Sequence, residues 1–177
     1  MLPLTLTTFL LPLLASAVPT PPITPPYKAG YVATAIPPYN VTGFAAGALI
    51  LSNRVYYHFN VTYDPSLPAI ECEALGTTLS EDLASIPQTT CGDPNTSTVS
   101  FKWTRHPDGS ADLLVRRDFP QEDGDKDAPT TEEAAHSVAK NETVIVGEGQ
   151  FARAVYSGPE DFMVRAWRYD GKGERNI

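Results

Sequence analysis

The clearest pattern in the chain is a strict alternation of apolar and polar positions from residue 54 to residue 63. A period of two is typical of a β-strand that buries one face and exposes the other. We therefore expect a half-buried strand here, with Asn60 on its wet face. The residues expected in the core are Val55, Tyr57, Phe59, Val61 and Tyr63, and those expected on the polar face are Arg54, Tyr56, His58, Asn60 and Thr62.

Seven further alternating or apolar stretches, each bounded by turn residues, predict more strands. Gly43 and Gly47 mark bends, and Pro107-Asp108-Gly109 has the turn chemistry of a hairpin. With no convincing amphipathic helix, we expect an all-β fold, a single antiparallel β-barrel or β-sandwich of about seven to nine strands. The stretches are 39–51, 70–74, 99–104, 111–115, 143–146, 150–156 and 161–169.

Other segments lack such a pattern. Residues 18–38 are rich in proline, which removes backbone donors, so they are predicted to form an extended arm before a domain at 39–169. Residues 76–90 are expected to form a loop. The acidic stretch 118–140 is expected to be a mobile insertion, and 170–177 a polar tail.

Residues 1–17 have the features of a secretory signal peptide. An apolar run to Leu14 is followed by Ala15-Ser16-Ala17, the small residues that a signal peptidase requires. The run is too short for a membrane span, and no later segment approaches the roughly 20 apolar residues of a transmembrane helix. The sequence therefore predicts a secreted, extracellular protein.

Secretion changes the interpretation of the cysteines and of four asparagines. In an oxidising compartment the only two cysteines, Cys72 and Cys91, are expected to pair as a disulfide. Four N-x-S/T acceptor sequences predict a glycoprotein. Their asparagines are Asn40, Asn60, Asn95 and Asn141.

The charge and the reactive side chains favour no enzyme class. A net charge of −8 argues against nucleic acid as a partner, because such binders need clustered lysine and arginine. His58, His106 and His136 lack metal-ligand spacing, and no G-x-S-x-G sequence occurs. Residues 123–127 have the carboxylate spacing of a calcium loop but lack its glycine and its final glutamate. We predict no catalytic residue, metal or cofactor. A catalytic pair of carboxylates in a cleft is the alternative that the sequence leaves.

Aromatic residues are the candidates for binding. Trp103 shares a face with Val99 and Phe101 and is expected in the core. Tyr56, Trp167 and Tyr169 are instead expected at the surface, where they could contact a partner or a ligand.

Several short motifs together resemble the fungal secreted Alternaria major-allergen-like family. They are the stretch 39–64, Glu71-Cys72-Glu73-Ala74, Thr90-Cys91-Gly92-Asp93-Pro94, the Val99–Phe101–Trp103 hairpin and Ser157-Gly158-Pro159-Glu160-Asp161-Phe162. The resemblance implies a compact β-barrel secreted by filamentous fungi, with no established catalytic mechanism. Some members act as allergens or as virulence effectors that contact plant defence proteins. Cys72 and Cys91 match the family's first disulfide.

Two departures from the family limit what carries over. Met163 stands where a second-bridge cysteine is expected, and no cysteine precedes the first strand, so no covalent dimer through an N-terminal cysteine is expected. The leading hypothesis is a non-enzymatic effector or allergen-like protein that binds a host defence or cell-wall protein. One alternative is a small-molecule carrier with an apolar pocket among the inward residues. The other is a secreted carboxylate-dependent hydrolase.

Overall fold

The computed structural model describes residues 32–49, 51–78, 82–119 and 129–170, which hold ten β-strands and no α-helix. Within these ranges, no helix is long and apolar enough to cross a membrane. The elements are β1 (Val32–Ala48), β2 (Arg54–Thr62), β3 (Ile70–Thr77), β4 (Ile86–Thr90), β5 (Val99–Arg105), β6 (Ala111–Asp118), β7 (Pro129–Val138), η1 (Lys140–Glu142), β8 (Thr143–Val146), η2 (Gly149–Phe151), β9 (Arg153–Tyr156) and β10 (Phe162–Asp170).

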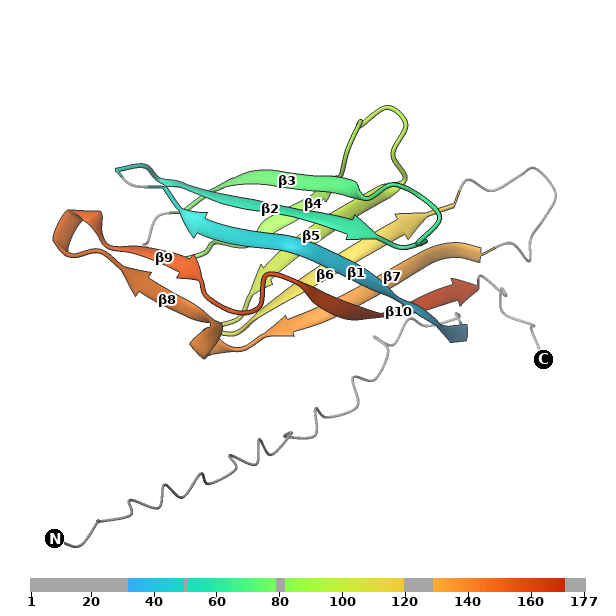
Figure 1. Ribbon diagram of the computed structural model, residues 1–177. Coiled ribbons are helices and arrows are strands. Elements are labelled where there is room, and N and C mark those ends of the chain that lie inside the picture. The colour runs from blue at the N-terminus through green and yellow to red at the C-terminus, as the bar shows by residue number, and fades with distance from the viewer. Residues whose placement is uncertain (1–31, 50, 79–81, 120–128, 171–177) are drawn as a thin grey trace, which may run out of the picture.

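Eight of the strands form one antiparallel sheet that nearly closes into a barrel (Figure 1). Their order is β3-β2-β1-β10-β7-β6-β5-β4. Strands β8 and β9 form a hairpin that extends the sheet beside β1, where Gly47 pairs with Val155. The predicted all-β antiparallel fold is therefore confirmed.

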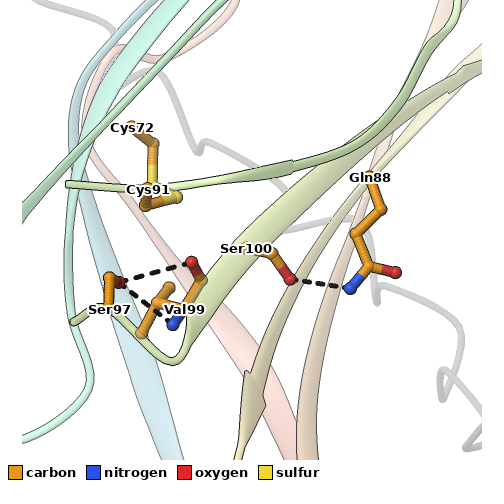
Figure 2. The surroundings of a disulfide bond; sticks show 6 residues. All are labelled: Cys72, Gln88, Cys91, Ser97, Val99 and Ser100. Atoms are coloured by element: carbon orange, nitrogen blue, oxygen red, sulfur yellow. Dashed lines mark hydrogen bonds between the residues drawn. A yellow bond between two sulfur atoms is a disulfide. The ribbon is translucent and has the colours of Figure 1, made fainter. Parts of the chain in front are cut away.

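The disulfide joins the two ends of the eight-strand path. Cys72 lies on β3 and Cys91 directly after β4, with their Cα atoms 4.3 Å apart (Figure 2). The neighbouring Gly92 N–H donates a 2.7 Å hydrogen bond to the carbonyl oxygen of Glu71. The predicted bond is thus confirmed, and it holds together the edges at which the barrel would otherwise be open.

Aromatic rings fill the centre of the barrel. The ring centroid of Phe44 lies 4.8 Å from Tyr156 and 5.8 Å from Trp103, and Phe59 packs edge-on against Phe101 at 5.0 Å. The residues predicted to face inward from the long strand are buried, except that Tyr63 at its end is only half-buried. Trp103 is fully buried, as expected.

The proline-rich arm was predicted to extend too far. Strand β1 already begins at Val32, which pairs with Asp170. Pro37 and Pro38 fall where the register shifts between Ile36 and Tyr39, so their missing N–H groups interrupt no ladder bond of β1 with β10. Proline is tolerated at such an irregularity, and the sequence pattern does not reveal that one occurs here.

Two other segments predicted to lack strands contain them. The loop predicted at 76–90 holds β4, and the insertion predicted at 118–140 holds β7, paired with β6 and β10. Its Glu132 and Glu133 are 3% and 4% exposed, so β7 buries charged side chains on both faces and shows no apolar alternation. The signal peptide, residues 18–31 of the arm, the calcium-like motif at 123–127 and the tail from 171 lie outside the described residues.

Candidate functional site

A line of apolar residues crosses the outer face of five neighbouring strands. The strand register pairs Val144 with Val155, Val155 with Gly47, Gly47 with Tyr56, and Tyr56 with Leu75. We call these five residues the Tyr56 row. Their neighbours along the strands, such as Tyr57, Ala46 and Ala154, are at most 1% exposed and face the barrel interior, so the row faces outward.

The side chains of the Tyr56 row are open to solvent to different degrees. Leu75 is 63% exposed and Val144 is 40% exposed, whereas Tyr56 and Val155 are half-buried. A pocket of about 420 Å³, lined in part by Tyr56 and Leu75, lies at the Leu75 end of the row, between β2 and β3. Apolar area of this kind on an outer face is typical of a surface that contacts a partner.

Polar side chains border the row on the same face. His58 Nε2 and Glu71 Oε1 lie 3.0 Å apart, and Glu73, the register partner of His58, is exposed. On the other side of Tyr56, Arg54 is exposed as well. An apolar centre with a polar rim is the usual anatomy of a protein–protein interface.

The expected surface positions of Trp167 and Tyr169 are wrong. They are 7% and 1% exposed, although they do lie on the face of β10 opposite to Val164. Strand β10 lies between β1 and β7, which flank Trp167 with Ala35 and Glu133. The alternation along β10 predicts the face on which a side chain lies but not how far it is exposed, because Met163 on the same face is 73% exposed.

Of the three predicted binding aromatics, only Tyr56 is open to solvent, and the structure does not bring the three together. Tyr56 pairs with Gly47 near the end of β1, whereas Trp167 pairs with Ala35 near its start. Sequence reasoning missed Leu75, Val144 and Val155. Val144 and Val155 lie on strands of four residues, and Leu75 lies just beyond the predicted stretch 70–74. Only the register between strands aligns them with Tyr56.

An ion cluster surrounds the buried Glu132 near the start of β7. The Tyr39 hydroxyl donates to Glu132 Oε2 at 2.7 Å, and Arg168 donates to Glu132 Oε1 through Nη2 at 2.6 Å and Nε at 3.0 Å. Arg117 lies 3.5 Å from Glu132, with its guanidinium over the Tyr63 ring at 4.1 Å. Burial and the adjacent carboxylate raise the pKa of Tyr39, so its phenol stays protonated and donates. Because both carboxylate oxygens are engaged, the cluster acts as a structural ion pair.

The histidines form no arrangement that would activate a nucleophile. Ser137 donates to Asp112 Oδ1 at 2.8 Å, and His106 Nε2 lies 2.7 Å from Asp112 Oδ2, so the carboxylate stands between the hydroxyl and the imidazole. A catalytic triad instead needs the imidazole beside the hydroxyl. In the part of the chain that the structure describes, no three histidine, cysteine or acidic side chains are placed to hold a metal ion.

The third histidine is buried in part. It was expected in a mobile segment, but His136 lies on β7, where its ring stacks on Phe162 with centroids 4.2 Å apart. Its Nε2 is buried and makes no hydrogen bond to another described group. Burial lowers the pKa of His136, against the opposing influence of Glu142 and Asp112.

A pocket of about 540 Å³ lies close to the disulfide. Four of its lining residues, Gln88, Ser97, Val99 and Ser100, are drawn near Cys91 in Figure 2. Serine and threonine hydroxyls from β4, β5 and the loop between them line much of it, with Asp118 and Phe119 beyond. The amide of Gln88 donates to Ser100 Oγ at 2.8 Å. Since these two polar groups satisfy each other, the pocket offers a ligand fewer free hydrogen-bonding groups than its composition indicates.

The four predicted glycosylation sites are all open to solvent to some degree. Asn40, Asn95 and Asn141 are exposed, and Asn60 is half-buried on the outer face of β2. Their modification stays a prediction.

Comparison with known proteins assigns no family to the chain. The chain matches no protein-family model, and no curated protein is similar to it.

Proposed function

We propose that this chain is a secreted, non-enzymatic protein that binds a host or cell-wall protein through the Tyr56 row. The observation that carries the proposal is an outward-facing apolar row, in which Leu75 and Val144 are exposed and Tyr56 is half-buried, on a barrel whose interior is filled with side chains. Tyrosine is enriched at interface positions that contribute most to affinity. The resemblance to Alternaria major-allergen-like effectors points to the same kind of partner and stays a prediction.

The filled interior favours surface binding over the carrier alternative. A carrier would need a cavity lined by inward residues such as Tyr57, Phe59 and Trp103. These side chains are at most 1% exposed, and the centroids of Tyr57 and Trp103 lie 5.4 Å apart. Rings packed at this distance occupy the volume that a ligand would require.

The positions of the buried acids weigh against the hydrolase alternative. Glu132 and Glu133 are adjacent on β7, so their side chains project to opposite faces of the sheet. A glycosidase that uses two carboxylates needs them to flank the glycosidic bond that is cleaved. Moreover, Glu132 is held by Arg168 and Tyr39.

The proposal is tested by capture with matched variants. The secreted protein is immobilised, exposed to extracellular host extract, and the bound proteins are identified by mass spectrometry. Leu75→Ser removes apolar area from the row, whereas Leu67→Ser changes another exposed leucine, 44% against 63%, in the turn after β2.

We expect one identified protein to be retained by the wild type and by Leu67→Ser but lost with Leu75→Ser. Equal retention by both variants would place the binding surface elsewhere. Turnover of a polysaccharide or ester by the purified protein, with no captured partner, would favour the hydrolase instead.

A further inference from the structure

Two of the acceptor sequences lie side by side in the sheet, in opposite directions. Asn40-Val41-Thr42 on β1 and Asn60-Val61-Thr62 on β2 are in reciprocal register, so Asn40 pairs with Thr62, and Thr42 with Asn60. Val41 and Val61 between them are fully buried. Both asparagines therefore project from the outer face of the barrel.

The amide of Asn40 is accessible for modification. Asn40 is exposed, and its side chain makes no hydrogen bond to any other residue in the described ranges. Thr42, which completes the acceptor sequence, lies two residues further along the strand and so shares the outer face.

The other neighbour of Asn40 is an exposed methionine. Asn40 pairs on β10 with Met163, which is 73% exposed, the largest value among the bulky apolar residues that the structure describes. The ladder between β10 and β7 includes no residue before Arg165, so within the described pairing Met163 is flanked by β1 alone. A group attached to Asn40 would therefore lie beside the thioether of Met163.

We propose that Asn40 carries an N-linked glycan whose first sugars cover Met163 and shield its sulfur from oxidants. In the modification, the Asn40 amide nitrogen forms a bond to the anomeric carbon of a lipid-linked oligosaccharide. The bond from that carbon to the lipid diphosphate breaks, and the amide loses a proton as the diphosphate leaves. The inference rests on the export that the proposed function also requires.

Two physical effects favour this placement of the sugar. The apolar face of a sugar ring removes exposed thioether area from water, which is favourable. Oxidation by peroxide transfers one oxygen to the sulfur, giving the sulfoxide and water, and it depends on access to the sulfur. A glycan at Asn60 stands one strand further from β10 and would cover Met163 less.

The test uses the full chain secreted from a eukaryotic host that glycosylates exported proteins. Peptide mapping locates the glycan, and the rate of Met163 sulfoxide formation is measured in dilute hydrogen peroxide. Thr42→Ala abolishes the acceptor sequence while keeping Asn40, and Thr42→Ser restores it. Asn95→Gln removes a predicted glycan from another part of the surface. Wild-type protein treated with a peptide-N-glycosidase loses its glycans without a substitution at Thr42, each glycosylated asparagine becoming an aspartate.

We expect the Asn40 peptide to carry sugar, and Met163 to oxidise about threefold faster or more in Thr42→Ala and in the enzyme-treated wild type. Thr42→Ser and Asn95→Gln should oxidise at the wild-type rate. An unmodified Asn40, or equal rates with and without its glycan, overturns the inference. Either result leaves the proposed function standing if Leu75→Ser still abolishes capture of the partner, so the two failures are distinguishable.

Discussion

The ring of Tyr56 lies over Gly47 on the neighbouring strand. A Cβ atom placed on Gly47 would stand 2.9 Å from Cε1 of Tyr56 and 3.1 Å from its hydroxyl oxygen. The absence of a side chain at position 47 therefore allows the hydroxyl end of the tyrosine to lie over β1, between Val155 and Leu75. This contact sets the shape of the Tyr56 row.

Gly47→Ala should weaken partner binding while leaving the fold intact. The new methyl group would displace a half-exposed ring, which can move into solvent at small cost. We expect a several-fold loss of affinity with the unfolding midpoint nearly unchanged, measured by biosensor binding and by urea titration. In a Tyr56→Ala background the same change should have no further effect on affinity, because the ring is already gone. An independent loss in that background would contradict the role given to the contact.

Removing the disulfide should destabilise the barrel strongly. The bond closes a loop with a sequence separation of 19 and joins the two ends of the eight-strand path. The Cys72→Ala/Cys91→Ala double variant is expected to lose about 3 kcal/mol of unfolding free energy, measured by urea denaturation. A reducing agent should shift the wild type toward the variant and leave the variant unaffected. Equal stability of the two oxidised proteins would show that the sheet closes without the bond.

Loss of the Tyr39 hydroxyl should cost far more than loss of the Tyr63 hydroxyl. Tyr39→Phe removes a hydrogen bond to the buried Glu132 carboxylate, for which we expect about 2 kcal/mol of destabilisation. Tyr63→Phe keeps the ring under Arg117 and should change stability by less than about 0.5 kcal/mol. Chemical denaturation of both variants checks the difference. Similar effects would mean that the ring, and not the hydroxyl, stabilises the cluster.

The stability of the barrel should depend on pH through His136. Burial lowers its pKa from the ordinary value of 6.5, so the folded protein keeps it neutral. As the pH falls below 6.5, the unfolded chain binds a proton that the folded protein does not, and folding stability decreases until the folded-state pKa is passed. This contribution is fully present above pH 6.5.

His136→Phe keeps a ring to stack on Phe162 but cannot bind a proton. We expect the variant to lose less stability than the wild type when the pH falls from about 8 to about 5, measured by urea denaturation. All other groups are the same in both proteins, so their contributions to the pH dependence cancel in the comparison. Identical pH profiles would show that His136 is not held neutral in the fold.

The sequence pattern predicted strands where one face is exposed to solvent and the other is buried. The alternation from residue 54 to residue 63 predicted β2 to within a residue, and the predicted short strand at 143–146 coincides with β8. It failed on β7, where both faces are buried, because Glu132 is held by Arg168 of β10 and Glu133 on the opposite face is 4% exposed. Burial of such acids depends on partners such as Arg168, which lies 36 residues away.

The candidate site was predictable only in part. Tyr56 was found from its place on the polar face of a strand, but its row depends on the register of five strands, which no local pattern contains. For Trp167 and Tyr169 the face was predicted correctly and the exposure was not. Exposure does not follow from alternation or from pairing, because Tyr56 and Trp167 both lie on strands paired on two sides and only Tyr56 is open to solvent.

The most direct test of the account is the dissociation constant of the captured partner for the wild type, Tyr56→Ala and Leu67→Ser. If the Tyr56 row is the docking surface, Tyr56→Ala should bind at least about tenfold more weakly, about 1.4 kcal/mol, with Leu67→Ser unchanged. A dissociation constant for Tyr56→Ala equal to that of the wild type would contradict it.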